Sequence, residues 1–103
     1  MQNMGGLLQK AQQMQKKMLE VEKKLKDTEV VGSASGGLVT IIMDGKGEIK
    51  KIKIDPSLKE DLEVIEDLIM AAISDGKKKA HQISEQEMKE VTGGMPMPPG
   101  LNF

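Results

Sequence analysis

A short β-hairpin between two long helical patterns is the feature that most constrains this 103-residue chain. Val39, Ile41 and Met43 alternate with their neighbours, and residues 44–47 (DGKG) tolerate the backbone angles of a tight turn. A second run rich in isoleucine then ends at Ile54. A hairpin this small is at best marginally stable alone in water. It must therefore pack on the helices, on a second copy of itself, or on both.

The hydrophobic and turn patterns predict a single α+β domain over residues 1–92, with a three-stranded antiparallel meander between two helices. The predicted elements are a helix over 7–27, strands over 28–32, 38–43 and 48–54, and a helix over 57–91. Residues 32–37 (GSASGG) are predicted to be a loop. This loop matches neither glycine-rich nucleotide fingerprint, which disfavours a phosphate cradle. Residues 93–103 form a Gly/Pro-rich tail.

The third predicted strand breaks its own alternation. Ile52 and Ile54 share one face, whereas Ile49 falls on the other, with Lys50 and Lys51 between them. A β-bulge at the lysine pair would return Ile49 to the core face. Alternatively, both faces of the strand are partly buried.

Composition excludes several classes of protein. The chain has no Cys, Trp or Tyr and a single Phe, so its core is aliphatic and it has no disulfide or thiolate metal site. Zero Cys fits a reducing cytosol. No apolar run approaches the roughly 18 residues that would span a bilayer. We therefore expect a cytoplasmic protein with no membrane partner.

The first helix carries an unbroken heptad pattern of apolar residues, the hydrophobic signature of a helix that pairs with another helix. This heptad seam consists of Leu7, Ala11, Met14, Met18, Val21 and Leu25. A monomer would leave the seam exposed as a larger apolar patch than soluble monomers usually show. The seam, together with the meander, is therefore the predicted interface of a two-fold homodimer.

The second helix is predicted to begin at Asp55-Pro56-Ser57, where Asp55 can cap and Pro56 fits the first turn. As one piece from 57 to 91 it would be roughly 50 Å long, so its distal half must project or pair. Gly76 is costly in a helix interior. It marks either a close contact or a bend.

Catalytic signals are nearly absent. His81 is the sole histidine, and its pair with Glu85 supplies only two ligands of a metal site. Glu66 and Asp67 are adjacent on a helix, so their side chains do not converge. We expect a protein that is not an enzyme and that needs no cofactor, metal or small-molecule substrate.

Four segments occur together in this chain: 7–18 (LLQKAQQMQKKM), 36–58 (GGLVTIIMDGKGEIKKIKIDPSL), 64–80 (VIEDLIMAAISDGKKKA) and 93–103 (GGMPMPPGLNF). In this combination the chain resembles the YbaB/EbfC family of nucleoid-associated proteins over essentially its whole length. The resemblance implies an intertwined, tweezer-like α+β homodimer with helical arms. It also implies a nucleoid-associated protein that binds double-stranded DNA and compacts it or modulates gene expression.

The lysines indicate where DNA would bind. All basic residues are Lys, and residues 1–27 carry six of them against three acidic residues. Lysine is a point charge without the planar fork of arginine, so it suits a row of phosphates better than base edges. One flank of the first helix carries the lysine stripe, which consists of Lys10, Lys16, Lys17, Lys23 and Lys24. Secondary candidates are Lys50, Lys51 and Lys53 on the meander and Lys77, Lys78 and Lys79 on the second helix.

Two other functions remain open from the sequence. One is a chaperone or coiled-coil scaffold similar to prefoldin, whose subunits also pair two long helices around hairpins. The other is a regulator that acts through a protein partner, with the acidic second helix as the recognition surface.

Overall fold

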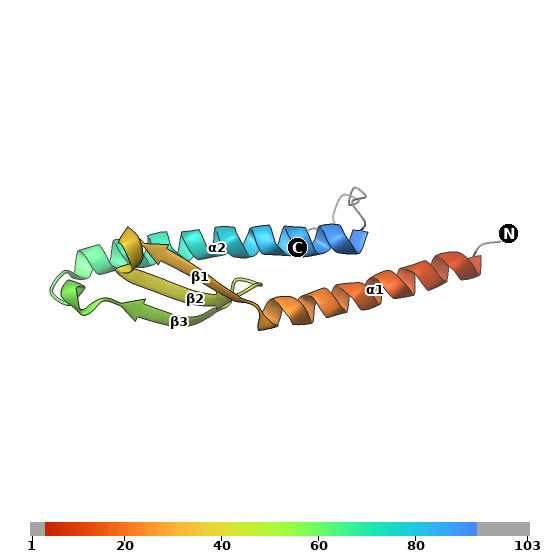
Figure 1. Cartoon of the computed structure of the whole chain (residues 1–103), viewed down its shortest axis with the longest axis horizontal. Helices are drawn as coiled ribbons and strands as arrows, with labels where there is room; N and C mark the ends of the chain where they lie inside the picture. Colours follow the sequence, from red (N-terminus) through yellow and green to blue (C-terminus); the bar gives the residue numbers. More distant parts are fainter. Residues whose placement is uncertain (1–3, 93–103) are drawn as a thin grey trace.

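Two long helices flank a three-stranded sheet in the computed structural model, which describes residues 4–92 (Figure 1). In chain order the elements are α1 (Met4–Asp27), β1 (Glu29–Ala34), η1 (Ser35–Gly37), β2 (Val39–Asp44), β3 (Ile49–Ile54), η2 (Pro56–Leu58) and α2 (Leu62–Thr92), where η1 and η2 are 3-10 turns. The sheet is antiparallel with the order β1-β2-β3, which confirms the predicted α+β meander. The predicted tail over 93–103 lies outside the described residues.

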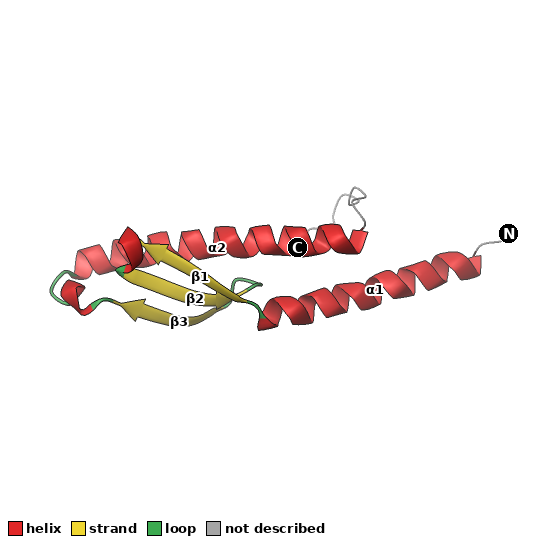
Figure 2. Cartoon of the chain, in the orientation of Figure 1, coloured by secondary structure: helices red, strands yellow, loops and turns green. Residues whose placement is uncertain are grey.

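The molecule is a rod rather than a sphere. Its principal extents are 71 × 23 × 17 Å, and its radius of gyration is 18.9 Å, against about 13 Å for a compact domain of 100 residues. Figure 2 shows α1 leaving the sheet beside α2 and continuing past the end of that helix. Near the sheet, α1 is held by the Gly45 N–H, which donates to the Leu25 carbonyl at 2.7 Å. Within residues 4–92, only this end of α1 is anchored on the sheet.

The core lies between α2 and the first two strands. On β2, Val39, Ile41 and Met43 are fully buried, as their alternation predicts. They pack with Val30 of β1 and with Ala72 of α2. In the described part of the chain, the sheet therefore has one face covered by α2 and one face without a helix (Figure 1).

A close approach of two backbones explains an error in the predicted loop. Gly32 was expected to end the strand over 28–32 and to open the loop over 32–37, but β1 continues to Ala34 and its even-numbered residues face inward. At Gly32, a Cβ atom would lie 2.2 Å from the carbonyl oxygen of Ala72 and 2.5 Å from the nitrogen of Gly76. Glycine is therefore required here by contact with α2. Of the two roles predicted for Gly76, the structure shows a close contact, because a Cβ atom there would lie 2.5 Å from the end of the Met43 side chain and 3.3 Å from the Gly32 Cα atom.

Strand β3 contains the predicted bulge. Met43 pairs with Ile49 and Ile42 pairs with Lys51, so Lys50 is the extra residue. Ile49, Ile52 and Ile54, called here the isoleucine row, consequently share the face of Met43, Ile41 and Val39. The row nevertheless remains between 39% and 46% exposed. This is because α2 lies over β1 and β2, away from β3 (Figure 1).

The predicted start of each helix was wrong by several residues. α1 begins at Met4 rather than at residue 7. A helix that has already nucleated gains a hydrogen bond with each added residue, and no neighbouring group obstructs this extension at Gly5 and Gly6. α2 begins at Leu62 rather than at residue 57. The Asp55 carboxylate does act as a cap and accepts from the Ser57 N–H at 2.9 Å, but it caps the 3-10 turn η2. The other element ends agree with the prediction within two residues, and the ends of α1 and β3 agree to the residue.

Candidate nucleic-acid interface

The five side chains of the lysine stripe are all solvent-exposed along α1. They run from Lys10 to Lys24, which at 1.5 Å per residue is about 20 Å of helix. Their exposure follows from the weak attachment of α1 to its own chain. The residues of the heptad seam show the same gradient, from 5% exposed at Leu25 to 63% at Leu7. The stripe therefore lies on an arm whose outer half is covered by nothing within residues 4–92.

An apolar groove of about 510 Å³ lies between α1, the β2–β3 turn and α2. The seam residues Met18, Val21 and Leu25 line one wall, and Ala80 and Met88 of α2 line the other. The sheet end of the seam therefore faces α2 of the same chain.

Lys24 differs from the other lysines of the stripe in the described part of the chain because its ammonium group forms an ion pair with a carboxylate. Its Nζ atom lies 2.9 Å from Oε2 of Glu87 on α2. The hydrogen bond and the negative charge of Glu87, with a further contribution from Glu90, raise the pKa of Lys24. This ion pair joins the two helices across their gap.

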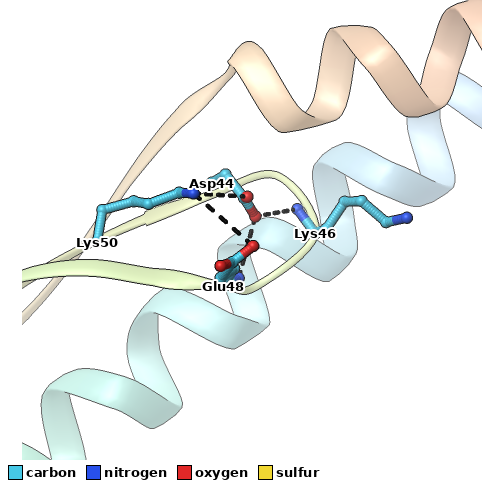
Figure 3. A network of polar contacts seen from close by, with 4 residues as sticks. All are labelled: Asp44, Lys46, Glu48 and Lys50. Carbon is cyan, nitrogen blue, oxygen red and sulfur yellow. Dashed lines mark hydrogen bonds and ion pairs between the residues drawn. The ribbon is translucent and has the colours of Figure 1, made fainter.

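The lysine at the bulge takes part in a local network around the hairpin turn (Figure 3). The Nζ atom of Lys50 lies 3.8 Å from Asp44 and 3.7 Å from Glu48. Asp44 is buried and accepts from the backbone N–H groups of Lys46 and Glu48 at 2.9 and 3.0 Å. Burial by itself raises the pKa of the Asp44 carboxyl. The two hydrogen bonds and the charges of Lys50 and Lys46 outweigh burial and leave this pKa below its ordinary value.

Lys51 and Lys53 lie on the opposite face of β3 from the isoleucine row. They pair with Ile42 and Thr40 of β2, so they face away from α2. Both side chains are exposed. They form a second, smaller group of cations on the face of the sheet that α2 leaves uncovered.

Lys79 has a structural role. Its Nζ atom donates to the Val31 carbonyl of β1 at 3.1 Å and lies 3.0 Å from the Asp75 carboxylate. Asp75 in turn accepts from the Ser33 N–H of β1, and this hydrogen bond, followed by that from Lys79, lowers the pKa of Asp75. Side chains of α2 thus occupy two backbone groups of β1. The ammonium group of Lys79 is already used within the fold.

The structure therefore separates the eleven predicted DNA-binding lysines into two sets. Lys24, Lys50 and Lys79 each have a carboxylate partner. In the part of the chain that the structure describes, the remaining eight form no ion pair: Lys10, Lys16, Lys17, Lys23, Lys51, Lys53, Lys77 and Lys78. Sequence reasoning missed the partners Glu87 and Asp75. No local signal reveals Glu87, because it lies far from Lys24 in the chain. Asp75, in contrast, stands four residues before Lys79 on α2, a spacing from which the ion pair could have been expected.

Residues 4–92 were also compared with the requirements of a metal site and of a membrane-spanning helix. The His81 Nε2 atom lies 2.7 Å from Oε1 of Glu85, and both side chains are exposed. Nowhere in this range do three or more His, Cys, Asp or Glu side chains gather as a metal site would require. Neither α1 nor α2 combines the length and the apolar character needed to cross a membrane.

Comparison with known proteins places these features in a family. The model of the YbaB/EbfC DNA-binding family matches residues 1–95. Nucleoid-associated proteins of Mesorhizobium japonicum and Rhodospirillum rubrum are 48% and 44% identical, over the whole of this chain and 98% of each relative. An uncharacterized protein of Helicobacter pylori has a similar crystal structure, with a TM-score of 0.75 and 34% identity over 86% of this chain and 92% of that one. The chain therefore belongs to the YbaB/EbfC DNA-binding family.

Proposed function

We propose that this protein binds double-stranded DNA as a homodimer, mainly by contacting phosphates with the lysine stripe of α1. The observation that carries the proposal is the stripe itself, a row of exposed cations on a projecting arm, in a member of a DNA-binding family. The names of the relatives support a nucleoid-associated protein. A homodimer that held one DNA segment at each arm would bring the two segments together. The protein would in this way compact DNA or modulate gene expression.

The chemistry of the stripe favours phosphate contacts over base contacts. The chain has fifteen basic residues, and none is Arg. The planar, rigid fork of arginine favours bidentate contacts, whereas lysine presents a compact point charge on a flexible stem. Lysines spaced along a helix can instead replace the counterions of the DNA backbone, which gives affinity without sequence preference.

The homodimer is supported by two apolar surfaces that residues 4–92 leave open. One is the outer part of the heptad seam, where Leu7 and Met14 are exposed. The other is the isoleucine row beside α2. Exposed apolar surface of this extent is typical of an interface. A second copy that covered both surfaces would give a closed two-fold assembly with one lysine stripe on each arm.

Light scattering at micromolar concentration should therefore give about twice the chain mass of 11.3 kDa. Ile52→Glu places a charge in the centre of the isoleucine row, so it should lower this mass toward that of one chain. Lys51→Glu adds the same acid on the other face of β3 and should leave the mass unchanged. A mass near 11 kDa for the unmodified protein would rule out the homodimer.

A chaperone or scaffold function is the second candidate, and the apolar groove favours it. The groove, together with the exposed Leu7 and Leu8 near the end of the arm, offers surface for an apolar client. Binding of such a client is driven by burial of apolar area, which salt strengthens or leaves unchanged. Binding of DNA phosphates weakens steeply with salt.

Affinity for duplex DNA measured from 50 to 200 mM salt tests the proposed function. We expect binding to two duplexes of unrelated sequence with equal affinity. For each, the logarithm of the affinity should fall linearly with the logarithm of the salt concentration, with a slope of about −0.9 per phosphate contact. A single-stranded oligonucleotide of the same length serves as the control for duplex geometry. Absence of duplex binding at 50 mM salt would refute the proposal and leave the chaperone function.

A further inference from the structure

The ion pair between Lys24 and Glu87 closes one end of the lysine stripe. The Lys24 side chain is 60% exposed, whereas that of Glu87 is 16% exposed. The carboxylate is thus enclosed in the gap between the two helices, and the ammonium group lies at the surface. Lys24 is the member of the stripe nearest the sheet, where α1 and α2 run side by side (Figure 1).

Glu87 offers Lys24 the same kind of contact that DNA would offer. A carboxylate and a phosphate both present anionic oxygens, and each accepts a charge-assisted hydrogen bond from an ammonium group. Glu90, one turn farther along α2, adds to the negative field at Lys24. In residues 4–92, Lys24 is the one member of the stripe with a carboxylate within ion-pair distance.

We infer that Glu87 is an internal competitor of DNA phosphate, which occupies Lys24 until a duplex displaces it. This inference rests on the proposed function, since it concerns regulation of the same stripe. The ammonium end of this ion pair is exposed to solvent, where an ion pair contributes little, so a phosphate in a row of contacts can replace the carboxylate. DNA that takes Lys24 also removes a contact between α1 and α2. The ion pair between the two helices and full use of the stripe by DNA therefore compete for the same ammonium group.

Glu87→Gln tests the inference because it removes the charge and keeps the shape of the side chain. We expect duplex affinity at 0.1 M salt to rise severalfold, and the salt slope to steepen by about 0.9, the value of one added phosphate contact. Glu85→Gln is the matched control. It removes an acidic charge from the same helix, but Glu85 pairs with His81 and not with a lysine of the stripe.

Glu87→Gln made in a Lys24→Gln background tests whether the gain in affinity depends on the ion pair between Lys24 and Glu87. There Glu87→Gln should give no greater gain than Glu85→Gln, because the lysine that it would release is absent. Equal gains from Glu87→Gln and Glu85→Gln in the unmodified background would overturn the inference and leave DNA binding intact. If the unmodified protein binds no duplex, the proposed function itself fails, and the inference fails with it.

Discussion

Gly32→Ala is expected to lower the free energy of unfolding by at least about 3 kcal/mol, at the upper end of overpacking costs. The added methyl group would lie 2.2 Å from the Ala72 carbonyl oxygen and 2.7 Å from the Gly76 Cα atom. Both atoms belong to the backbone of α2, so no side chain can turn aside. The helix must move off the sheet, which also loosens its contact with Met43. Chemical denaturation followed by circular dichroism, at constant protein concentration, measures the loss.

Two other glycines of the chain provide matched controls for this substitution. Gly5→Ala should not destabilise the protein and should stabilise it by up to about 1 kcal/mol, because Gly5 lies in open space within α1. Gly76→Ala should cost less than Gly32→Ala. Its methyl group meets chiefly the end of the Met43 side chain, at 2.5 Å, and that flexible chain can shift. A loss at Gly32 no larger than that at Gly76 would contradict the close backbone contact.

Replacing Lys10, Lys16, Lys17 and Lys23 together by glutamine should weaken duplex binding at 0.1 M salt by at least about 100-fold. These are the four lysines of the stripe without a carboxylate partner in the described part of the chain. If each contacts one phosphate, the salt slope should flatten by about three to four. The loss should be equal for unrelated duplexes, because phosphates carry no sequence. Fluorescence anisotropy over a salt series measures both quantities.

The control removes four equal charges elsewhere, through replacement of Lys51, Lys53, Lys59 and Lys78 by glutamine. All four are exposed and lie outside α1. This variant should retain most of the affinity and most of the salt slope. Light scattering and circular dichroism should show the same mass and helix content for both variants. If the two variants lose affinity equally, binding depends on total charge and the site is not on α1.

Local patterns were sufficient to predict much of the fold. The alternation of Val39, Ile41 and Met43 identified the central strand and its buried face, and the irregular spacing before Ile52 indicated the bulge. The heptad seam identified α1. In each case the signal lies in the spacing of neighbouring residues, which the sequence displays directly.

Contacts between distant segments could not be predicted in the same way. Gly32 looked like part of a flexible loop, and only the backbone of α2 explains its place in a strand. The lysines of the stripe looked equivalent along α1, but Glu87 distinguishes Lys24 from the others. Lys79 looked like a free cation, although it is bound to β1. Each of these depends on how α2 lies on the sheet, which composition and periodicity do not specify.

The bonds from Lys79 and Asp75 to β1 have a consequence for how the protein behaves when it is crowded. Strands exposed at the border of a sheet can recruit further chains and so seed fibrils. On β1, the Val31 carbonyl and the Ser33 N–H are already engaged by side chains of α2. An incoming strand finds these positions taken, which leaves β3 as the border open to addition. A sheet that can be extended from one side only terminates after a single pairing, so stacking of this protein ends at a pair of chains and does not continue indefinitely.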